Sequence, residues 1–467
     1  MSVEFRDECQ FDIALPVVVI GAGACGLCAA LAAHDSGADV LVLEQDKTPL
    51  GTTAMSTGLI PAAGTPEQRD AGIEDSPEIF ARDILAKHGG QTDASVVDVL
   101  AATSAETIRW LRDSHALPLS LVEGFTYPGH SHRRMYGTPN RSGTELMAGL
   151  QRAVVEAGID ILTQAKVISL ICDATRTVRG VRIMRPGGTI EEIGCDALVL
   201  ASSGFAGSRE MVAHFIPAMA TAVIHSHPGN QGDAIKWGEA LGASLADMGA
   251  YQGHGGLAVD HGVPILWPLI MEGGIQVNRL GRRFSDESKG YSEQAETILS
   301  QPDGVAWSIF DQTLYDMMLQ FTDFSDAVSA GAIKSAGTPE QLAEVLGLPA
   351  GALVATLLED QDLKSGRLED EFGRDFRGRH VLRAPYYAAK VTGALFHTQG
   401  GLCVDSDARV LDTTGCPFPN LFAGGGAARG ISGGGSSGYI AGNGLLTATS
   451  LGKIAGRAAA RHVAEGV

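Results

Sequence analysis

The segment 16–44, with the sequence PVVVIGAGACGLCAALAAHDSGADVLVLE, constrains the fold more than any other part of the chain. Its β-branched run at 17–20 predicts a short buried strand, and the Ala/Leu-rich stretch after it predicts a helix that reaches His34. Gly37 ends that helix, and the next apolar run predicts a second strand that finishes at Glu44. Strand, helix and strand in this order indicate a parallel β-α-β unit and therefore an α/β fold.

Between the first strand and the helix lies the glycine motif G-x-G-x-x-G, formed by Gly21, Gly23 and Gly26. The first glycine permits a tight turn, the second lets the backbone approach a pyrophosphate, and the third lets helix and strand pack closely. The helix that begins near Ala24 directs its N-terminus towards the anion. Glu44 can bind both ribose hydroxyls of an adenosine and disfavours a 2′-phosphate. The unit therefore predicts a dinucleotide site, and NADP is not the expected ligand.

Three further segments favour FAD over NAD. Residues 49–64 follow the second strand with small and hydroxyl side chains, which suit a backbone that wraps around a flavin. Residues 195–207 predict another buried strand that ends in a small-residue turn. Residues 419–456 predict a strand, a glycine-rich loop and a helix whose N-terminus could face the flavin. Each glycine run alone could be a flexible loop. The candidate FAD-binding residues outside the glycine motif are Gly51, Thr52, Thr53, Ser56, Gly58, Val167, Ser202, Gly204, Asp233, Gly425, Gly426, Asn443, Leu445 and Leu446.

The composition argues against several classes of protein. With 467 residues, 45% of them apolar, the chain can bury a large core across two or three domains. A formal charge of −19 argues against nucleic acid or an anionic membrane as the main partner. No apolar run suggests a membrane span, no secretory signal is visible, and seven scattered cysteines predict reduced thiols. We therefore expect a cytoplasmic protein without a metal site, haem or iron–sulfur cluster. Electrons taken up by the flavin would then have to pass to an external acceptor.

Four segments resemble one flavoprotein family, which contains soluble fumarate reductase, urocanate reductase and the 3-ketosteroid dehydrogenases. Residues 75–111 resemble the helical segment that follows the flavin motif in fumarate reductases. Residues 229–248, 277–287 and 384–405 resemble the G-D-G, R-F-x-x-E and H-T-x-G-G signatures of the family. The resemblance extends over nearly the whole chain.

The resemblance implies a Rossmann-like FAD-binding domain interrupted by an α+β substrate-capping domain, with the active site between the two. On this basis we expect the FAD-binding domain at 1–251 and 390–467 and the capping domain at 252–389. Respiratory complexes of the family link FAD covalently to a histidine, and the segment 52–56 (TTAMS) contains none. FAD is therefore expected to be non-covalent.

Two positions separate this chain from the fumarate reductases that it resembles. Those enzymes carry an arginine proton donor four residues after the glutamate of R-F-x-x-E, where this chain has Tyr291. They carry a carboxylate-binding arginine in the C-terminal glycine-rich loop, where this chain has Tyr439. Both tyrosines resemble those of the ketosteroid dehydrogenases, whose N-E-S-x-x-Y motif is similar to residues 286–291. His397 is retained, and His254 corresponds to another substrate histidine of the family.

Tyrosine suits the removal of a proton next to a ketone. Desaturation beside a carbonyl removes a proton from the α-carbon and a hydride from the β-carbon. An ionised tyrosine, with a reference pKa of about 10, is a stronger base than carboxylate or imidazole, and a neutral one can donate to the carbonyl oxygen. We assign Tyr291 as the base and Tyr439 as the carbonyl donor, helped by a backbone N–H near Gly442. An ordinary packed aromatic is the alternative for each tyrosine.

The polar stretch 127–137 leaves two interpretations open. Arg134 and the histidines before it could bind a substrate carboxylate, or the stretch could be a solvated loop. Tyr127 or Tyr136 could assist the base.

The sequence thus predicts an FAD-dependent dehydrogenase that introduces a C=C bond α,β to the carbonyl of a cyclic ketone. 4-Oxocyclohexanecarboxylate and a 3-ketosteroid are both candidate substrates, and oxygen, a quinone or another compound could accept the electrons. The enzyme alternative is a fumarate- or urocanate-type reductase of an unsaturated carboxylate, with Tyr291 as its proton donor. The alternative of another class is a flavin-binding electron-transfer or sensor protein.

Overall fold

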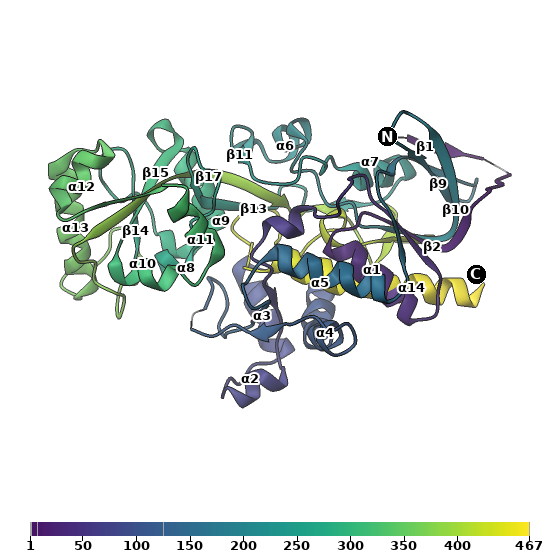
Figure 1. Cartoon of the computed structure of the whole chain (residues 1–467), viewed down its shortest axis with the longest axis horizontal. Helices are drawn as coiled ribbons and strands as arrows, with labels where there is room; N and C mark the ends of the chain where they lie inside the picture. Colours follow the sequence, from purple (N-terminus) through teal and green to yellow (C-terminus); the bar gives the residue numbers. More distant parts are fainter. Residues whose placement is uncertain (1, 7, 125, 467) are drawn as a thin grey trace.

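The computed structural model describes residues 2–6, 8–124 and 126–466. A larger and a smaller sheet, each with its own helices and hydrophobic core, lie towards opposite ends of the long axis of the molecule (Figure 1). The N-terminal and C-terminal segments both belong to the part with the larger sheet, and the chain passes through the smaller sheet between them. This mixed architecture confirms the α/β fold class.

The larger sheet contains the β-α-β unit expected from the sequence. Its strands follow the order β1-β8-β9-β10-β2-β3-β7, and β20 joins β10 and β19. β2 pairs in parallel with both β3 and β10, so the carboxyl ends of these strands meet at one edge, where ligands bind in such folds. The strands are β1 (Ser2–Phe5), β2 (Ala14–Ile20), β3 (Val40–Leu43), β7 (Asp160–Leu162), β8 (Lys166–Cys172), β9 (Val178–Met184), β10 (Ile190–Leu200), β19 (Arg409–Leu411) and β20 (Pro417–Ala423).

The two ends of the chain meet where α1 (Ala24–Asp35) packs on α14 (Asn443–Glu465), two helices that lie side by side in Figure 1. A Cβ on Gly456 would lie 2.0 Å from the carbonyl oxygen of Ala29, so the backbones can approach this closely only with glycine there. The contact brings the C-terminal glycine-rich loop next to the N-terminal glycine motif. The other helices of this part are α2 (Pro66–Asp70), α3 (Pro77–Lys87), α4 (Ala94–Asp113), α5 (Gly143–Glu156) and α7 (Asp233–Leu241).

The smaller sheet is centred on β17 (Tyr386–Thr398), which runs from the far end of the molecule towards its middle (Figure 1). β13, β15 and β16 pair with it in antiparallel orientation, β11 pairs with it in parallel, and β14 adds to β15. β13 begins beside the expected boundary at 252, whereas the expected boundary at 389 falls inside β17. The other strands are β11 (Val223–Ile224), β13 (Tyr251–Ala258), β14 (Ile275–Val277), β15 (Val305–Asp311) and β16 (Ile333–Ala336).

Among the helices of this part, α9 (Tyr291–Leu299) lies directly on the sheet because glycines leave room beneath it. A Cβ on Gly393 of β17 would lie 2.2 Å from the carbonyl oxygen of Ala295, and one on Gly253 of β13 would lie 2.7 Å from that of Ser292. This close packing fixes the start of the helix, and Tyr291 is its first residue. The other helices here are α8 (Pro268–Met271), α10 (Gln312–Met318), α11 (Thr322–Ser329), α12 (Pro339–Leu346) and α13 (Ala350–Lys364). α6 (Arg209–Phe215) belongs to a third core cluster, which it shares with β13, α9 and β17.

The described ranges contain no helix that is both long and apolar enough to cross a membrane. Within the same ranges, no three side chains of histidine, cysteine, aspartate or glutamate gather as a metal site would require. The cysteines are free thiols, and burial raises the pKa of Cys25 to about 12.

Candidate active site

A cavity lined by both parts of the molecule contains most of the residues expected from the sequence. The part with the larger sheet contributes the glycine motif, the segment after β3 and the first turns of α14, and the part with the smaller sheet contributes residues of β13, α9 and β17. The expected residues that line the cavity are Gly21, Gly23, Ala24, Glu44, Gly51, Thr52, Thr53, Ser56, Tyr127, Val167, Ser202, Asp233, His254, Tyr291, His397, Gly425, Gly426, Tyr439, Gly442 and Leu445. The expected residues outside the lining are Gly26, Gly58, Arg134, Gly204, Asn443 and Leu446.

The three glycines of the motif have the different roles that their spacing suggests. Gly21 adopts a φ of +103°, and a Cβ on it would lie 2.5 Å from the carbonyl oxygen of Ala201. A Cβ on Gly26 would lie 1.7 Å from the carbonyl oxygen of Gly21, so helix and turn are in contact there. Around Gly23 the nearest atom is Thr53 Oγ1 at 3.7 Å, and its backbone borders the cavity. Gly21 and Gly26 shape the turn, and the backbone of Gly23 is left open to the cavity.

Glu44 follows β3 directly and is buried at the cavity wall. Its Oε2 accepts a hydrogen bond from the Ala22 N–H at 2.9 Å, and its Oε1 accepts one from the Asp46 N–H at 2.9 Å. These bonds hold the carboxylate beside the glycine turn, where it can still accept hydrogen bonds from ligand hydroxyls.

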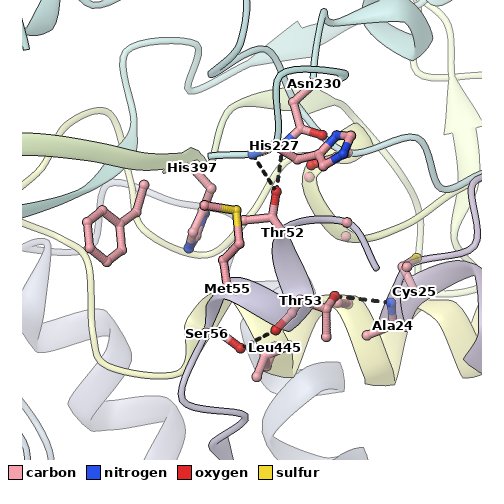
Figure 2. Close-up of a pocket in the computed structure, with 18 of the residues that line it drawn as sticks. Ala24, Cys25, Thr52, Thr53, Met55, Ser56, His227, Asn230, His397 and Leu445 are labelled. Atoms are coloured by element: carbon pink, nitrogen blue, oxygen red, sulfur yellow. Dashed lines mark hydrogen bonds between the residues drawn. The ribbon is translucent and has the colours of Figure 1, made fainter. Parts of the chain in front are cut away.

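The segment after β3 forms a short 3₁₀ helix, η1 (Thr52–Met55), that closes one side of the cavity (Figure 2). Thr53 Oγ1 accepts a hydrogen bond from the Ala24 N–H at 3.2 Å and so joins η1 to the start of α1. Thr52 Oγ1 accepts one from Asn230 Nδ2 at 2.7 Å, and Figure 2 shows this contact opposite His397. The hydroxyl-rich segment is therefore part of the cavity wall.

Two polar atoms on the wall have no hydrogen-bond partner among the described residues, namely Ser202 Oγ and Trp237 Nε1. Buried polar groups are normally hydrogen-bonded, so a ligand with polar atoms along its length fits this cavity. With the Gly23 backbone, Glu44 and the N-terminus of α14, the donor and acceptor set fits FAD, whose pyrophosphate, ribose and flavin ring carry the matching atoms.

At the other end of the cavity, aromatic rings from separate elements meet. Tyr291 of α9 and Tyr439, which lies in the loop before α14, have ring centroids 5.9 Å apart and are both buried. His254 of β13 lies 5.1 Å from the Tyr291 ring, and His397 of β17 lies 5.7 Å from the Tyr439 ring. The fold thus brings the four expected side chains together, although no two of them share an element.

The environment of the two tyrosines distinguishes them. Burial raises the pKa of Tyr291 well above its ordinary value, and the neighbouring Tyr439 and Tyr127 raise it further. Burial also raises the pKa of Tyr439, but the Tyr291 hydroxyl and the backbone N–H groups of Gly444 and Gly442 act in the opposite direction. Both side chains are therefore neutral hydroxyls near neutral pH. Negative charge on the hydroxyl oxygen of Tyr439 is stabilised by more hydrogen-bond donors than negative charge on that of Tyr291.

Both histidines are neutral, because burial lowers the pKa of His254 to about 3 and that of His397 to about 4. His254 Nδ1 accepts a hydrogen bond from the Gly256 N–H at 3.0 Å, which leaves its proton on Nε2. His397 Nδ1 lies 3.1 Å from Gln399 Nε2 and 3.4 Å from the Thr398 carbonyl oxygen, so either tautomer of this ring has a partner at Nδ1. Each ring can donate one hydrogen bond, and neither supplies a positive charge for a carboxylate.

The loop that leads to Tyr291 is anchored by Glu287. Its carboxylate is fully buried and accepts hydrogen bonds from Arg283 at 2.9 Å, Arg374 at 3.1 Å and the Gln276 N–H at 3.0 Å. Burial alone would raise the pKa of Glu287, but Arg374 and Arg283 lower it to about 2. These ion pairs and hydrogen bonds hold the loop, one turn before the catalytic candidate, in a single position.

Arg134 does not have the position that a substrate-binding role requires. Its guanidinium is fully buried and pairs with Asp75 at 2.7 Å and Asp83 at 2.5 Å. The stretch that contains it is therefore not a solvated loop at this residue, because two acidic residues of the α2–α3 region draw the arginine inward. Next to it, His130 Nε2 donates to the Ala441 carbonyl at 2.9 Å, so this cluster supports the loop of Tyr439.

Several lining residues had no signal in the sequence. Trp267, Leu266 and Phe396 are apolar and read as ordinary core residues, and Phe396 stacks on His254 with a centroid distance of 5.0 Å. Asp323, from α11, is one aspartate among many in an acidic chain. Only their positions in space identify them as part of the site.

Comparison with known proteins agrees with this geometry. The family described as FAD binding domain matches residues 16–445. The chain is 30% identical to a Shewanella frigidimarina protein named Probable fumarate reductase Ifc3, over 96% of this chain and 75% of that protein. It is 25% identical to 4-oxocyclohexanecarboxylate 2-dehydrogenase of Sinomonas cyclohexanicum, over 96% of this chain and 93% of that protein.

A solved structure, that of 3-ketosteroid-delta4-(5alpha)-dehydrogenase from Rhodococcus jostii RHA1 in complex with 4-androstene-3,17-dione, has a TM-score of 0.78 to this chain at 25% identity. The match covers 98% of this chain and 100% of that chain. The family match spans nearly all of both sheets, and the similar proteins include one named as a reductase and one named as a dehydrogenase. The chain therefore belongs to the FAD binding domain family and is a flavoprotein oxidoreductase.

Proposed function

We propose that the protein is an FAD-dependent dehydrogenase that introduces a C=C bond next to the carbonyl group of a cyclic ketone. The observation that carries the proposal is the pair of Tyr291 and Tyr439, whose rings meet at the cavity wall with centroids 5.9 Å apart. Two relatives named for oxidation of a cyclic ketone, one a curated protein and one a solved structure, support the same direction of reaction.

In this proposal Tyr439 binds the ketone oxygen. Its hydroxyl lies near the backbone N–H groups of Gly442 and Gly444 at the N-terminus of α14, and all three are donors. As negative charge develops on the carbonyl oxygen, donors that are already oriented stabilise it without reorganisation. Tyr439 therefore makes the α-hydrogen of the bound ketone more acidic.

The phenolate form of Tyr291, a small fraction at neutral pH because its pKa is raised, then takes the α-proton and becomes the neutral phenol, and the C–H electron pair becomes the enolate. The β C–H bond breaks with its electron pair as the α,β double bond forms, and FAD supplies the acceptor for this hydride. An external acceptor takes up the two electrons of each turnover. Tyr291 suits the role because it is buried against the cavity, where water does not compete for the proton.

The charges of the cavity favour a neutral ketone over a carboxylate. Among the described residues that line the cavity, Lys166 is the one lysine or arginine. It lies at the Glu44 end of the cavity, because the N–H of the preceding residue, Ala165, donates a hydrogen bond to the Glu44 carbonyl at 2.8 Å. Arg134 is neutralised elsewhere, and His254 and His397 are uncharged. A substrate carboxylate near the tyrosine pair would therefore have no lysine or arginine of the cavity lining as a counter-charge, and Arg141, which acts on Tyr127, lies outside the lining.

The test is anaerobic mixing of the FAD-loaded protein with a 3-ketosteroid and with substituted cyclohexanones. Bleaching of the flavin, together with the ultraviolet absorbance of an enone product, supports the proposal. If the chemically reduced protein is instead reoxidised by fumarate or urocanate and no ketone bleaches it, the reductase alternative replaces the proposal. The 30% identity to a protein named as a fumarate reductase makes this the first alternative to exclude. No response to either class favours an electron-transfer or sensor protein.

A further inference from the structure

An unpaired carboxylate faces the cavity from the part with the smaller sheet. Asp323, the second residue of α11, lines the cavity and is half-buried. Burial raises the pKa of Tyr127, and of the charges near it Arg141 lowers this pKa and Asp323 raises it. Burial and Tyr439, and after them Tyr127, raise the pKa of Tyr291. Asp323 and Tyr127 line the same cavity as the tyrosine pair, and Asp323 comes from α11, an element separate from those that carry Tyr291 and Tyr439.

This carboxylate has no structural partner. In the described part of the chain, no hydrogen bond or ion pair reaches Asp323. The buried carboxylates outside the cavity do have partners, as Glu287 has in Arg283 and Arg374 and Asp360 has in Lys364. The place of Asp323 in the first turn of α11 favours a negative charge, but among the described residues the half-buried carboxylate still lacks a direct hydrogen-bond partner. Burial, with Asp326 nearby, raises the pKa of Asp323 to about 6, so the group is ionised in mildly alkaline buffer.

The walls near Tyr127 and the tyrosine pair are mainly apolar. Leu59, Met135, Leu266 and Trp267 line the cavity and belong to the same hydrophobic cluster as Tyr291 and Tyr439. A bound molecule that reaches from the tyrosine pair to Asp323 must therefore have a ketone at one end, an apolar body and a hydrogen-bond donor at the other end.

We propose that Asp323 determines substrate specificity by accepting a hydrogen bond from a hydroxyl or amino group at the end of the substrate remote from the ketone, and by repelling substrates that carry a carboxylate there. The inference rests on the proposed function, because it takes the tyrosine pair as the ketone site. It narrows the substrate class to alicyclic ketones with a remote donor.

Matched substrates and variants test this inference at about pH 8. The first pair of ketones is 4-(hydroxymethyl)cyclohexanone and 4-oxocyclohexanecarboxylate. The second, larger pair is two 3-ketosteroids, one with a hydroxyl and the other with a ketone on the ring remote from the 3-keto group. The variants are Asp323→Asn, Asp323→Lys and, as the control, Asp326→Asn, which changes an exposed aspartate of the same helix outside the cavity. Dissociation constants come from ligand-induced shifts in thermal unfolding, and flavin bleaching is recorded separately.

We expect Asp323→Asn to weaken binding of the hydroxyl ketones about tenfold, since a hydrogen bond to a charged acceptor is lost, and to leave the diketone unchanged. Asp323→Lys should bind the carboxylate ketone better than the wild-type protein does. Asp326→Asn should behave like the wild type. Equal binding of both members of each pair by the wild type, or equal losses in the two Asn variants, would overturn the inference.

The two hypotheses fail in different ways. If ketones bleach the flavin but substitutions at Asp323 do not change which ketones bind, the specificity inference is wrong and the proposed function stands. If no ketone bleaches the flavin and none shifts the unfolding temperature, the proposed function is wrong, and the inference is overturned with it.

Discussion

The rings of Tyr291 and Tyr439 meet edge to face, with centroids 5.9 Å apart and planes inclined by 64°. One ring comes from the first residue of α9 in the part with the smaller sheet, and the other from the loop before α14 in the part with the larger sheet. Each hydroxyl changes the acidity of the other, since Tyr439 raises the pKa of Tyr291 and Tyr291 lowers that of Tyr439. We therefore expect substitution of either tyrosine to change the behaviour of the other.

Replacing Tyr291 with Phe should leave ketone binding nearly unchanged and slow flavin reduction by about 10²–10⁴-fold, the usual effect of losing a positioned base. Stopped-flow absorbance under anaerobic conditions measures the rate. Exchange of the substrate α-hydrogens with deuterated water should also disappear. Tyr315→Phe is the matched control, because that ring packs on Phe324 and does not line the cavity. A normal rate in Tyr291→Phe would show that Tyr291 only packs.

The rate of flavin reduction by ketone should rise with pH. Because burial and Tyr439 raise the pKa of Tyr291, only a small fraction is phenolate at neutral pH. The rate should increase about tenfold per pH unit between about pH 7 and 9, without a plateau below about pH 10. A plateau of the rate near neutral pH would point to a base other than Tyr291. We do not expect that base to be His254 or His397, because burial lowers the pKa of both well below neutral pH.

Tyr439→Phe removes a carbonyl donor and should reduce the rate of flavin reduction by about 10²–10³-fold. It also removes one of the groups that raise the pKa of Tyr291, so the residual activity should have a pH profile displaced to lower pH. A profile with an unchanged midpoint would mean that the two hydroxyls are not coupled. The shift of the pH profile distinguishes loss of the Tyr439 hydroxyl from loss of packing. Loss of packing alone would lower the rate by the same factor at every pH.

FAD should be released by acid or heat without proteolysis, because the η1 segment contains no histidine that could link it. Flavin that stays with the denatured chain would contradict this. Glu44→Ala should lower the fraction of protein that retains FAD after gel filtration, since hydrogen bonds from hydroxyls to a charged acceptor are lost. Glu44→Gln, which keeps the shape and one acceptor oxygen, should retain more FAD than Glu44→Ala.

Arg134→Met should reduce the free energy of unfolding by about 3–5 kcal/mol, because it leaves Asp75 and Asp83 buried without their counter-charge. Urea denaturation measures the change. The adjacent Arg133→Met is the control and should have a much smaller effect, as its side chain is half-buried. A loss of ketone affinity with unchanged stability would instead give Arg134 a role at the substrate.

The sequence by itself predicted the features that depend on neighbouring residues. The turn at Gly21, the packing at Gly26 and the position of Glu44 after β3 all follow from spacing within one β-α-β unit, and the structure has them as expected. Local backbone geometry decides these features, so a short stretch of sequence contains the necessary information.

Only the tertiary structure decided which distant side chains meet. Arg134 lies in a polar stretch that suggested a solvated or carboxylate-binding loop, yet Asp75 and Asp83 hold it in the interior. Asp323 has no motif around it and lines the cavity because α11 packs there. Tyr291 and Tyr439 face each other because glycines let α9 settle on its sheet and α14 pack against α1. These contacts depend on how separate elements pack, and packing is set by the summed burial of many side chains rather than by the residues beside each one.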